Sequence, residues 1–202
     1  MVSLAIVFEE IARVWMGVAG VIGSHSLACR MIAAHGTEEQ KQTLLPELAS
    51  GVRRTGIGLT EPGAGSDLQG IATRAWRDGD DYIVRGTKMW ITNARYADPL
   101  PCLVKTDPDA SPRHKGMSIL LVPMRAEGVT VTRDLGKLGY KGPETCEVVT
   151  RRRARAGHRA ARRRRRPRHA TSAVRAGVRA HQHRGPRRRR RQRRGRRGAR
   201  VP

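Results

Sequence analysis

The sequence predicts an α+β fold in which helices come first and a β-rich part follows. Apolar residues recur at helical spacing through residues 2–35, and a second helical segment with capping signals covers residues 37–51. From residue 55 the pattern changes to short runs of strand-forming residues separated by Gly, Pro and Asp. Helices followed by many short strands are typical of segregated α and β parts and not of a parallel βαβ sheet.

The positive charge of the chain is confined to its last quarter. The 202 residues carry a formal net charge of +24, yet residues 1–150 hold 17 basic and 17 acidic residues and are neutral. Residues 151–202 hold 24 arginines and no acid, with few apolar residues. Such a segment cannot bury enough surface to offset its ordering entropy, so we expect it to be disordered. Any binding of polyanions predicted from the charge applies to this segment alone.

Residues 2–35 are predicted to be helical, with Glu9, Glu10 and Arg13 off the apolar face. We expect Gly20 and Gly23 to divide this stretch into two helices. The predicted apolar face consists of Leu4, Ile6, Val7, Ile11, Val14 and Trp15.

The second helical segment carries its own start and stop signals. Thr37 can cap the helix, and Gln40 stands at the third helical position, as in a capping box. Pro46 and Gly51 are expected to mark its end.

The β-rich part begins with a predicted hairpin, "TRAW-RDGDD-YIVRG", in which Asp78-Gly79 supplies a turn with positive φ. The segment "TKMWITNA" alternates, and further short strands are predicted at "LPCLVKT", "GMSILLVP" and "GVTVTRDL". One face of the alternating segment would carry Thr87, Met89, Ile91 and Asn93, and the other Lys88, Trp90 and Thr92.

The cysteines and the N-terminal segment bear on the compartment. Cys29, Cys102 and Cys146 are odd in number and form no CxxC pair, which favours reduced cysteines in a cytoplasmic protein over a disulfide framework or a metal site. The apolar N-terminal stretch is interrupted by charge and lacks a preceding basic region. We therefore expect neither a signal peptide nor a membrane span.

Two segments of the β-rich part carry the features of a ligand site. In "GLTEPGAGSD" (residues 58–67), Gly63 and Gly65 allow close approach of the backbone to a ligand, and Thr60 and Ser66 supply hydroxyls. In "KMWITNA" (residues 88–94), an aromatic ring lies between residues that can stack on and hydrogen-bond a planar ligand. When each segment is considered alone, its composition also fits a simpler interpretation. The first segment fits an ordinary loop, and the second fits a strand with a buried tryptophan.

Together with "GTEEQKQTLLPELASG", "GMSILLVP" and "LGKLGYKGPETCEVV", these segments occur in the order and spacing of the flavin-dependent acyl-CoA dehydrogenases. The sequence resembles that family over residues 3–149. The resemblance implies a partial N-terminal helical domain (1–53) and a middle, β-barrel-like domain (54–150). A C-terminal four-helix domain, present in family members, is expected to be missing and replaced by the disordered arginine-rich tail (151–202).

The resemblance also implies the cofactor FAD and a set of residues around it. Ile57, Leu59 and Thr60 would face the isoalloxazine ring, with Thr60 hydrogen-bonding it. Ser66 would contact the flavin or the acyl-CoA thioester arm. The other strand would contribute Trp90, Ile91 and Thr92.

The reaction implied is α,β-desaturation of an acyl-CoA thioester. A glutamate base removes the α-proton as hydride passes to the flavin, and electrons leave through an electron-transfer flavoprotein. The family's usual assembly is a homo-tetramer. The base lies in the C-terminal helical domain, and residues 151–202 contain no glutamate. No catalytic residue is therefore assigned, and the chain is expected to be an inactive fragment that also lacks an early helical stretch of the family.

The arginine-rich segment has a possible origin in the genetic code. Plausible GC-rich codons for residues 151–157, read one nucleotide later, give Asp-Asp-Ala-Arg-Val-Pro-Ala, close to the continuation found in the family. The same shift over residues 180–187 gives Arg-Ile-Asn-Ile-Ala-Ala-Arg, which resembles the opening of a C-terminal helix. We therefore expect a frameshift after about residue 149.

Two other hypotheses stay open at this point. A functional polyarginine arm would bind nucleic acid through phosphates, without base specificity and with steep salt dependence. Alternatively, the β-rich part is a fragment that does not fold alone, because apolar surface is left uncovered. We do not expect residues 57–92 to retain FAD through purification.

Overall fold

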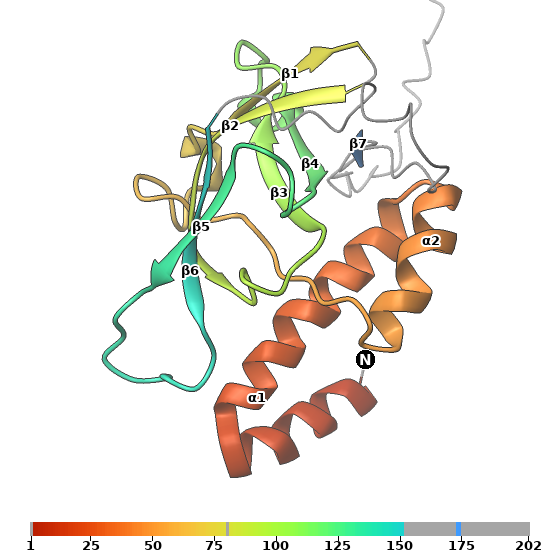
Figure 1. Cartoon of the computed structure of the whole chain (residues 1–202), viewed down its shortest axis with the longest axis vertical. Helices are drawn as coiled ribbons and strands as arrows, with labels where there is room; N and C mark the ends of the chain where they lie inside the picture. The colour runs from red at the N-terminus through yellow and green to blue at the C-terminus, as the bar shows by residue number, and fades with distance from the viewer. Residues whose placement is uncertain (1, 80, 152–172, 175–202) are drawn as a thin grey trace, which may run out of the picture.

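The structure is a computed structural model, and it describes residues 2–79, 81–151 and 173–174. The helices come first and lie together on one side of the strands (Figure 1). This order confirms the predicted α+β class, with helices followed by a mixed sheet. The helical elements are α1 (Val2–His35), α2 (Glu38–Ala49), η1 (Leu68–Gly70) and η2 (Arg113–Gly116). The strands are β1 (Arg74–Asp78), β2 (Asp81–Thr92), β3 (Leu100–Lys105), β4 (Met117–Val122), β5 (Val129–Asp134), β6 (Thr145–Thr150) and β7 (Ala173–Val174).

The strands form one sheet in the order β5-β6-β2-β1-β3-β4-β7. Neighbouring strands are antiparallel except β1 and β3, which are parallel. The predicted hairpin is confirmed: Asp78 pairs with Asp81, and Gly79 has φ of 65°. The expectations for residues 152–202, disorder and an out-of-frame origin, lie outside the described residues apart from β7.

Helix α1 bends at a different place from the predicted one. Its backbone leaves the helical region at Trp15 (φ −154°, ψ 96°), whereas Gly20 and Gly23 lie within continuous helix. Gly20 serves packing instead, because a Cβ there would lie 1.2 Å from the Tyr140 hydroxyl. The indole of Trp15 packs beside Gly142, in the loop between β5 and β6. The prediction that Gly20 and Gly23 divide this stretch into two helices was therefore wrong.

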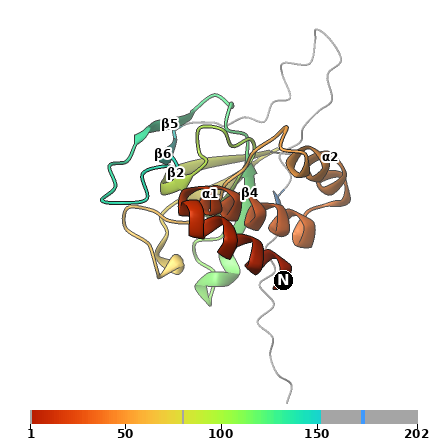
Figure 2. The same ribbon diagram turned by 90° about the horizontal axis from the view of Figure 1, so that it is seen from below.

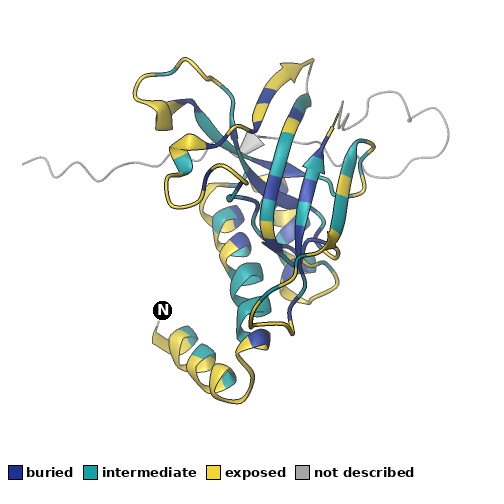
Figure 3. Ribbon diagram, turned by 90° about the vertical axis from the view of Figure 1, so that its left-hand side faces the viewer, coloured by how far each residue is buried: buried dark blue, intermediate teal, exposed yellow. Residues whose placement is uncertain are grey.

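The arm of α1 before the bend projects away from the rest of the chain and is largely exposed (Figure 3). The predicted apolar face is accordingly not buried against the described residues: Val14 is 90% exposed and Trp15 59%.

Helix α2 begins as predicted. The Thr37 hydroxyl accepts a hydrogen bond from the Gln40 N–H, and the Gln40 side chain accepts one from the Thr37 N–H, which confirms the capping box. Pro46 lies inside the helix, so it was wrongly expected to mark the end. A proline in the last turn loses only its own donor, and its carbonyl still accepts from Ser50 N–H at 3.1 Å. Gly51, with φ of 77°, follows the end of the helix.

The helices pack on the sheet through a small apolar cluster and two polar links. Ile32, Leu44 and Leu48 of the helices meet Leu121 of β4. His25 Nδ1 accepts from Thr55 N–H at 3.2 Å, so its Nε2–H donates to the Leu48 carbonyl at 3.0 Å. Viewed from below, α1 crosses in front of the strands (Figure 2).

The end of β2 is joined to the helices by Asn93. Its side-chain amide donates to the carbonyls of Val21 in α1 (3.0 Å) and Thr55 (3.2 Å). Asn93 itself adopts φ of 67°, a left-handed conformation that asparagine tolerates. Asn93 thereby links residues 55–60, which lead into the candidate site, to both helix α1 and the end of β2.

Candidate cofactor site

The segment that contains the first predicted motif lies between strands β3 and β2. Gly58 N–H donates to the Pro101 carbonyl at 2.8 Å, and Leu103 N–H donates to the Gly58 carbonyl at 2.9 Å. Two residues later, Met89 N–H of β2 donates to the Thr60 carbonyl at 2.8 Å. The two motifs, about 30 residues apart in sequence, are therefore in direct contact through the main chain.

A buried ion pair holds the turn that follows. Lys88 Nζ lies 2.7 Å from a Glu61 carboxylate oxygen, and both side chains are only 4% exposed. The same ammonium donates to the Leu59 carbonyl at 3.1 Å. The Glu61 carboxylate also accepts from the main-chain N–H groups of Ala72 and Thr73. The carboxylate thus joins the turn, β2 and the start of β1. Sequence reasoning missed this pair, although a lysine amid apolar strand residues and a glutamate in the turn were the available signals.

Hydrogen bonding decides the ionisation of the pair. Burial raises the pKa of the Glu61 carboxyl, but hydrogen bonds from Lys88, Thr73 and Ala72 outweigh burial, so the pKa lies below its ordinary value. Burial lowers the pKa of Lys88, and the carboxylate of Glu61 opposes that effect. The Glu61 carboxyl is therefore ionised near neutral pH, and its charge offsets part of the cost of burying the Lys88 ammonium.

The ion pair predicts an acid-sensitive contribution to stability. Because Glu61 binds its proton more weakly in the folded chain than in the unfolded chain, the contribution is complete above the unfolded carboxyl pKa. It is lost as pH falls through the lower, folded pKa. We expect Glu61→Gln to destabilise the chain near neutral pH, and the deficit to shrink as pH falls below about 4.5. Urea unfolding at pH 7, 5, 4 and 3 checks this, and a deficit constant across these values would contradict it.

The turn itself is short and open. Glu61 and Ala64 exchange main-chain hydrogen bonds around Pro62–Gly63, and the Asp67 carboxylate caps η1 by accepting from Gln69 N–H at 3.0 Å. An added Cβ at Gly63 or Gly65 would meet no protein atom within 4 Å. Neither glycine is needed for packing against the described residues. Open backbone of this kind leaves room for a ligand to approach closely.

Strand β2 is irregular at Trp90. Lys88 pairs with Val148 and Ile91 with Cys146, so two residues of β2 oppose one residue of β6, which is a β-bulge. Trp90 in the bulge has φ of 62°, unusual for a bulky residue, and its side chain is 49% exposed. The predicted alternation was therefore wrong here: Lys88 and Ile91 are both buried, because the extra residue changes the side on which later residues point.

Three predicted site residues offer hydroxyl groups. The hydroxyls of Thr60, Ser66 and Thr92 make no hydrogen bond to any described residue. Thr60 and Thr92 are half-buried, and Ser66 is exposed in the turn. The contact between Thr60 and Met89 places the first hydroxyl beside the bulge. Unsatisfied hydroxyls beside an exposed indole suit a planar ligand with polar ring atoms.

The apolar members of the predicted set divide into two groups. Ile57 and Leu59 are half-buried in the segment between β3 and β2. Ile91 is 1% exposed and belongs to the sheet core, so its side chain cannot touch a surface ligand and only its main chain is available. Ile91 stays a prediction for its main chain, because its side chain points inward beyond the bulge.

Other kinds of site are not found in the part of the chain that the structure describes. Within residues 2–79 and 81–151, no group of three or more His, Cys, Asp or Glu side chains could hold a metal ion. Among the described helices, none is long and apolar enough to cross a membrane.

Comparison with known proteins identifies the two parts of the chain. Residues 1–52 match the family model of the acyl-CoA dehydrogenase N-terminal domain, and residues 56–152 match that of the acyl-CoA dehydrogenase middle domain. The chain belongs to the acyl-CoA dehydrogenase family. Members of this family are FAD-dependent oxidoreductases.

Individual acyl-CoA dehydrogenases agree over the same region. Acyl-CoA dehydrogenase FadE26 of Mycobacterium tuberculosis is 48% identical over 103 residues, which cover 50% of this chain and 26% of the relative. Isovaleryl-CoA dehydrogenase of Pongo abelii is 37% identical over 145 residues, 71% of this chain and 34% of the relative. A crystal structure of a glutaryl-CoA dehydrogenase from Mycobacterium smegmatis in complex with FADH2 is 39% identical, with a TM-score of 0.61. That match covers 67% of this chain and 33% of the solved one, so the chain spans about a third of its relatives' length.

Proposed function

We propose that the surface formed by Thr60, Trp90 and Thr92 is the middle-domain part of an FAD site. The observation that carries this proposal is the main-chain hydrogen bond between Met89 and Thr60, which brings together two motifs that resemble the flavin-lining segments of the family. The indole of Trp90 in its bulge is exposed, and the hydroxyls of Thr60 and Thr92 in the same two segments have no hydrogen-bond partner among the described residues.

The residues present fit the cofactor on the evidence of their own chemistry. A planar ring with polar edges matches an exposed indole between hydroxyl donors. The open backbone at Gly63 and Gly65 suits close approach of the ligand. Ser66, exposed in the same turn, is proposed to contact the flavin or the acyl-CoA thioester arm. FAD, when bound, supplies the hydride-accepting chemistry; the chain's residues bind and orient it.

The activity of the family to which this site belongs is α,β-desaturation of an acyl-CoA thioester, and we propose acyl-CoA as the ligand class that lies against the flavin. An electron-transfer flavoprotein as acceptor, a homo-tetramer and a cytoplasmic location are parts of the same proposal. They rest on the family resemblance and, for the location, on the cysteine count. No residue is assigned as the base: Glu61 is committed to the buried ion pair, and Glu144 accepts from Arg95 N–H at 3.2 Å in the β6 region.

Titration of the chain with FAD tests the cofactor site. We expect reversible binding seen as quenching of flavin fluorescence, without retention of FAD through purification and without turnover of acyl-CoA. Gly63→Ala is expected to leave the unfolding midpoint unchanged, because its Cβ meets no protein atom, and to weaken FAD binding. Thr60→Val is expected to weaken binding by about two- to tenfold through one lost hydrogen bond.

The matched control is Thr130→Val, an exposed strand threonine of β5, which should leave FAD affinity unchanged. Equal FAD affinity in the parent chain, Gly63→Ala and Thr60→Val would refute the site.

The arginine-rich segment supports a separate proposal. We infer that residues 151–202 arise from out-of-frame translation, and sequencing the coding DNA around codon 149 decides this. If the shifted frame does not encode a four-helix dehydrogenase domain, the proposal fails. Non-specific nucleic-acid binding by the 24 arginines is the alternative role. It requires the segment to be present in a stable cellular protein.

A further inference from the structure

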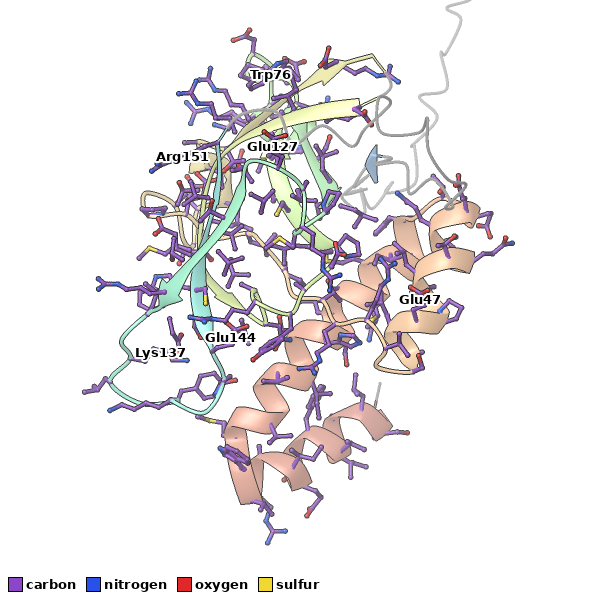
Figure 4. The ribbon with its side chains drawn as sticks, in the orientation of Figure 1. Glu47, Trp76, Glu127, Lys137, Glu144 and Arg151 are labelled. Carbon is purple, nitrogen blue, oxygen red and sulfur yellow. The ribbon has the colours of Figure 1, made fainter. Side chains whose placement is uncertain are left out.

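A second surface of the sheet has a composition that the dehydrogenase role does not use. A cavity of about 930 Å³ lies on the outer side of β1, β2 and β6, within the range of small-molecule sites. Its lining includes Trp76, Ile83, Arg85, Thr87, Val149 and Arg151. Trp76 and Arg151 both lie at the end of the sheet away from the helices (Figure 4).

Strand register shows that these side chains share one face. Trp76 is paired with Ile83, and Thr87 with Val149. The alternating neighbours Ala75, Val84 and Val148 are buried in the core. In Figure 3 the strands accordingly alternate between buried and more exposed positions. The cavity therefore lies on the face opposite the core, and the Trp76 side chain, 47% exposed, forms part of it.

Charge on this face is separated along the hairpin, with Arg74 and Arg85 at one end and Asp78 and Asp81 at the other. Arg74 and Arg85 are exposed and directly opposite each other across β1 and β2, and like charges in that position destabilise a sheet. Arg74, Arg85 and Arg151 form no ion pair with any of the described residues. The nearest acids on the hairpin are Asp78 and Asp81, beyond Trp76 at the far end.

The chain's own arginine-rich segment cannot supply the missing negative charge. Residues 151–202 contain no Asp, no Glu and no aromatic residue. Glu127, in the turn before β5, makes no ion pair with any described residue either. An external anion would relieve the repulsion between the paired arginines, and an aromatic ring could stack on the exposed indole one rung away.

We propose that this cavity binds a mononucleotide, with its base stacked on Trp76 and its phosphates on Arg85, which lines the cavity, and on the cross-strand neighbour Arg74 beside it. The site is separate from the flavin surface, because Thr87, the lining residue of β2 nearest to Trp90, precedes it by three residues, about 10 Å at 3.3 Å per residue. The ligand is either a free nucleotide or the nucleotide end of coenzyme A. This inference stands independently of the proposed FAD site.

The test is calorimetric titration of the full chain with adenosine diphosphate at physiological salt, compared with inorganic pyrophosphate, which has the same number of phosphates. The 24 arginines of residues 151–202 are expected to attract either ligand, so the site is measured as the additional affinity for the nucleotide. We expect Trp76→Ala and Arg85→Ala each to weaken adenosine diphosphate binding about tenfold or more. Trp76→Phe and Arg85→Lys should keep most of the affinity.

Arg133→Ala is the matched control, since it removes an exposed arginine on β5 that does not line the cavity. It should leave binding unchanged, and thermal unfolding followed by circular dichroism shows that each variant keeps its folded domain. Coenzyme A that competes with adenosine diphosphate identifies the substrate as the nucleotide source; without competition the source is a free nucleotide. Equal binding of adenosine diphosphate to the parent chain, Trp76→Ala and Arg85→Ala would overturn the proposal, as would equal affinity of the parent chain for pyrophosphate.

Discussion

Replacing Lys88 with methionine is expected to destabilise the chain by about 3–5 kcal/mol, the usual cost of removing one partner of a buried ion pair. The methionine fills similar space, but it leaves the Glu61 carboxylate buried and opposed only by two main-chain N–H groups. It also leaves the Leu59 carbonyl without the donor that Lys88 supplies at 3.1 Å. The unfolding free energy from urea titration monitored by circular dichroism measures the effect.

The pH dependence separates loss of the ion pair from loss of packing. In the parent chain the pKa of Glu61 is lowered against the effect of burial, in part by the hydrogen bond and charge of Lys88. The parent therefore gains stability as pH rises through the carboxyl pKa, and the variant lacks the Lys88 part of that gain, so the deficit of Lys88→Met should grow from pH 4 to pH 7.

Two further variants serve as controls for this prediction. Lys141→Met, which removes an exposed lysine from the β5–β6 loop, should change stability by no more than about 0.5 kcal/mol. The double variant Glu61→Gln with Lys88→Met should recover part of the loss, because the buried charge is gone. If Lys88→Met were as stable as Lys141→Met, the ion pair would have no structural role.

The sequence was sufficient to predict both helices and the strands from β1 to β5, because each carries a local signal, whereas β6 and the two 3-10 helices were not predicted. The capping box at Thr37, the Asp78-Gly79 turn and the short apolar strands depend on neighbours within a few residues. The helix break at Trp15 was missed since it depends on Gly142, more than 100 residues away. Local propensity points to Gly20 and Gly23, and only tertiary packing shows that Gly20 serves Tyr140.

The sequence was sufficient to locate the candidate site, but it did not predict which side chains of the site are buried and which are exposed. The motifs identify Thr60, Trp90 and Thr92, and the structure brings their segments into contact. The bulge at Trp90 inserts one residue into the strand period, so strict alternation gives Ile91 and Lys88 opposite faces although both are buried. The Glu61–Lys88 pair likewise depends on a chain path that no local pattern encodes.

Gly56→Ala is expected to be the most damaging single-methyl change near the site. A Cβ at this position would lie 2.3 Å from the Thr92 carbonyl oxygen, well inside contact distance, and 3.5 Å from Leu100 and Ser24 side-chain atoms. The obstructing atom is main chain, so no rotamer change relieves it. Overpacking in a tight site costs about 1–3 kcal/mol and sometimes more, and we expect the upper part of that range.

The same substitution should also disturb the cofactor surface, because it moves the 55–60 segment away from the end of β2. Asn93 bridges these elements through Thr55, and Thr60 contacts Met89, so displacement at Gly56 changes the spacing between the Thr60 and Thr92 hydroxyls. Gly56→Ala is therefore expected to lose both stability and FAD affinity, whereas Gly63→Ala, which meets no protein atom, loses FAD affinity alone. Thermal unfolding and flavin titration of the two variants, measured side by side, distinguish a glycine required by the fold from one required by the ligand. Equal unfolding midpoints for the two variants would show that β2 yields at Thr92 and that the close approach at Gly56 does not fix the site.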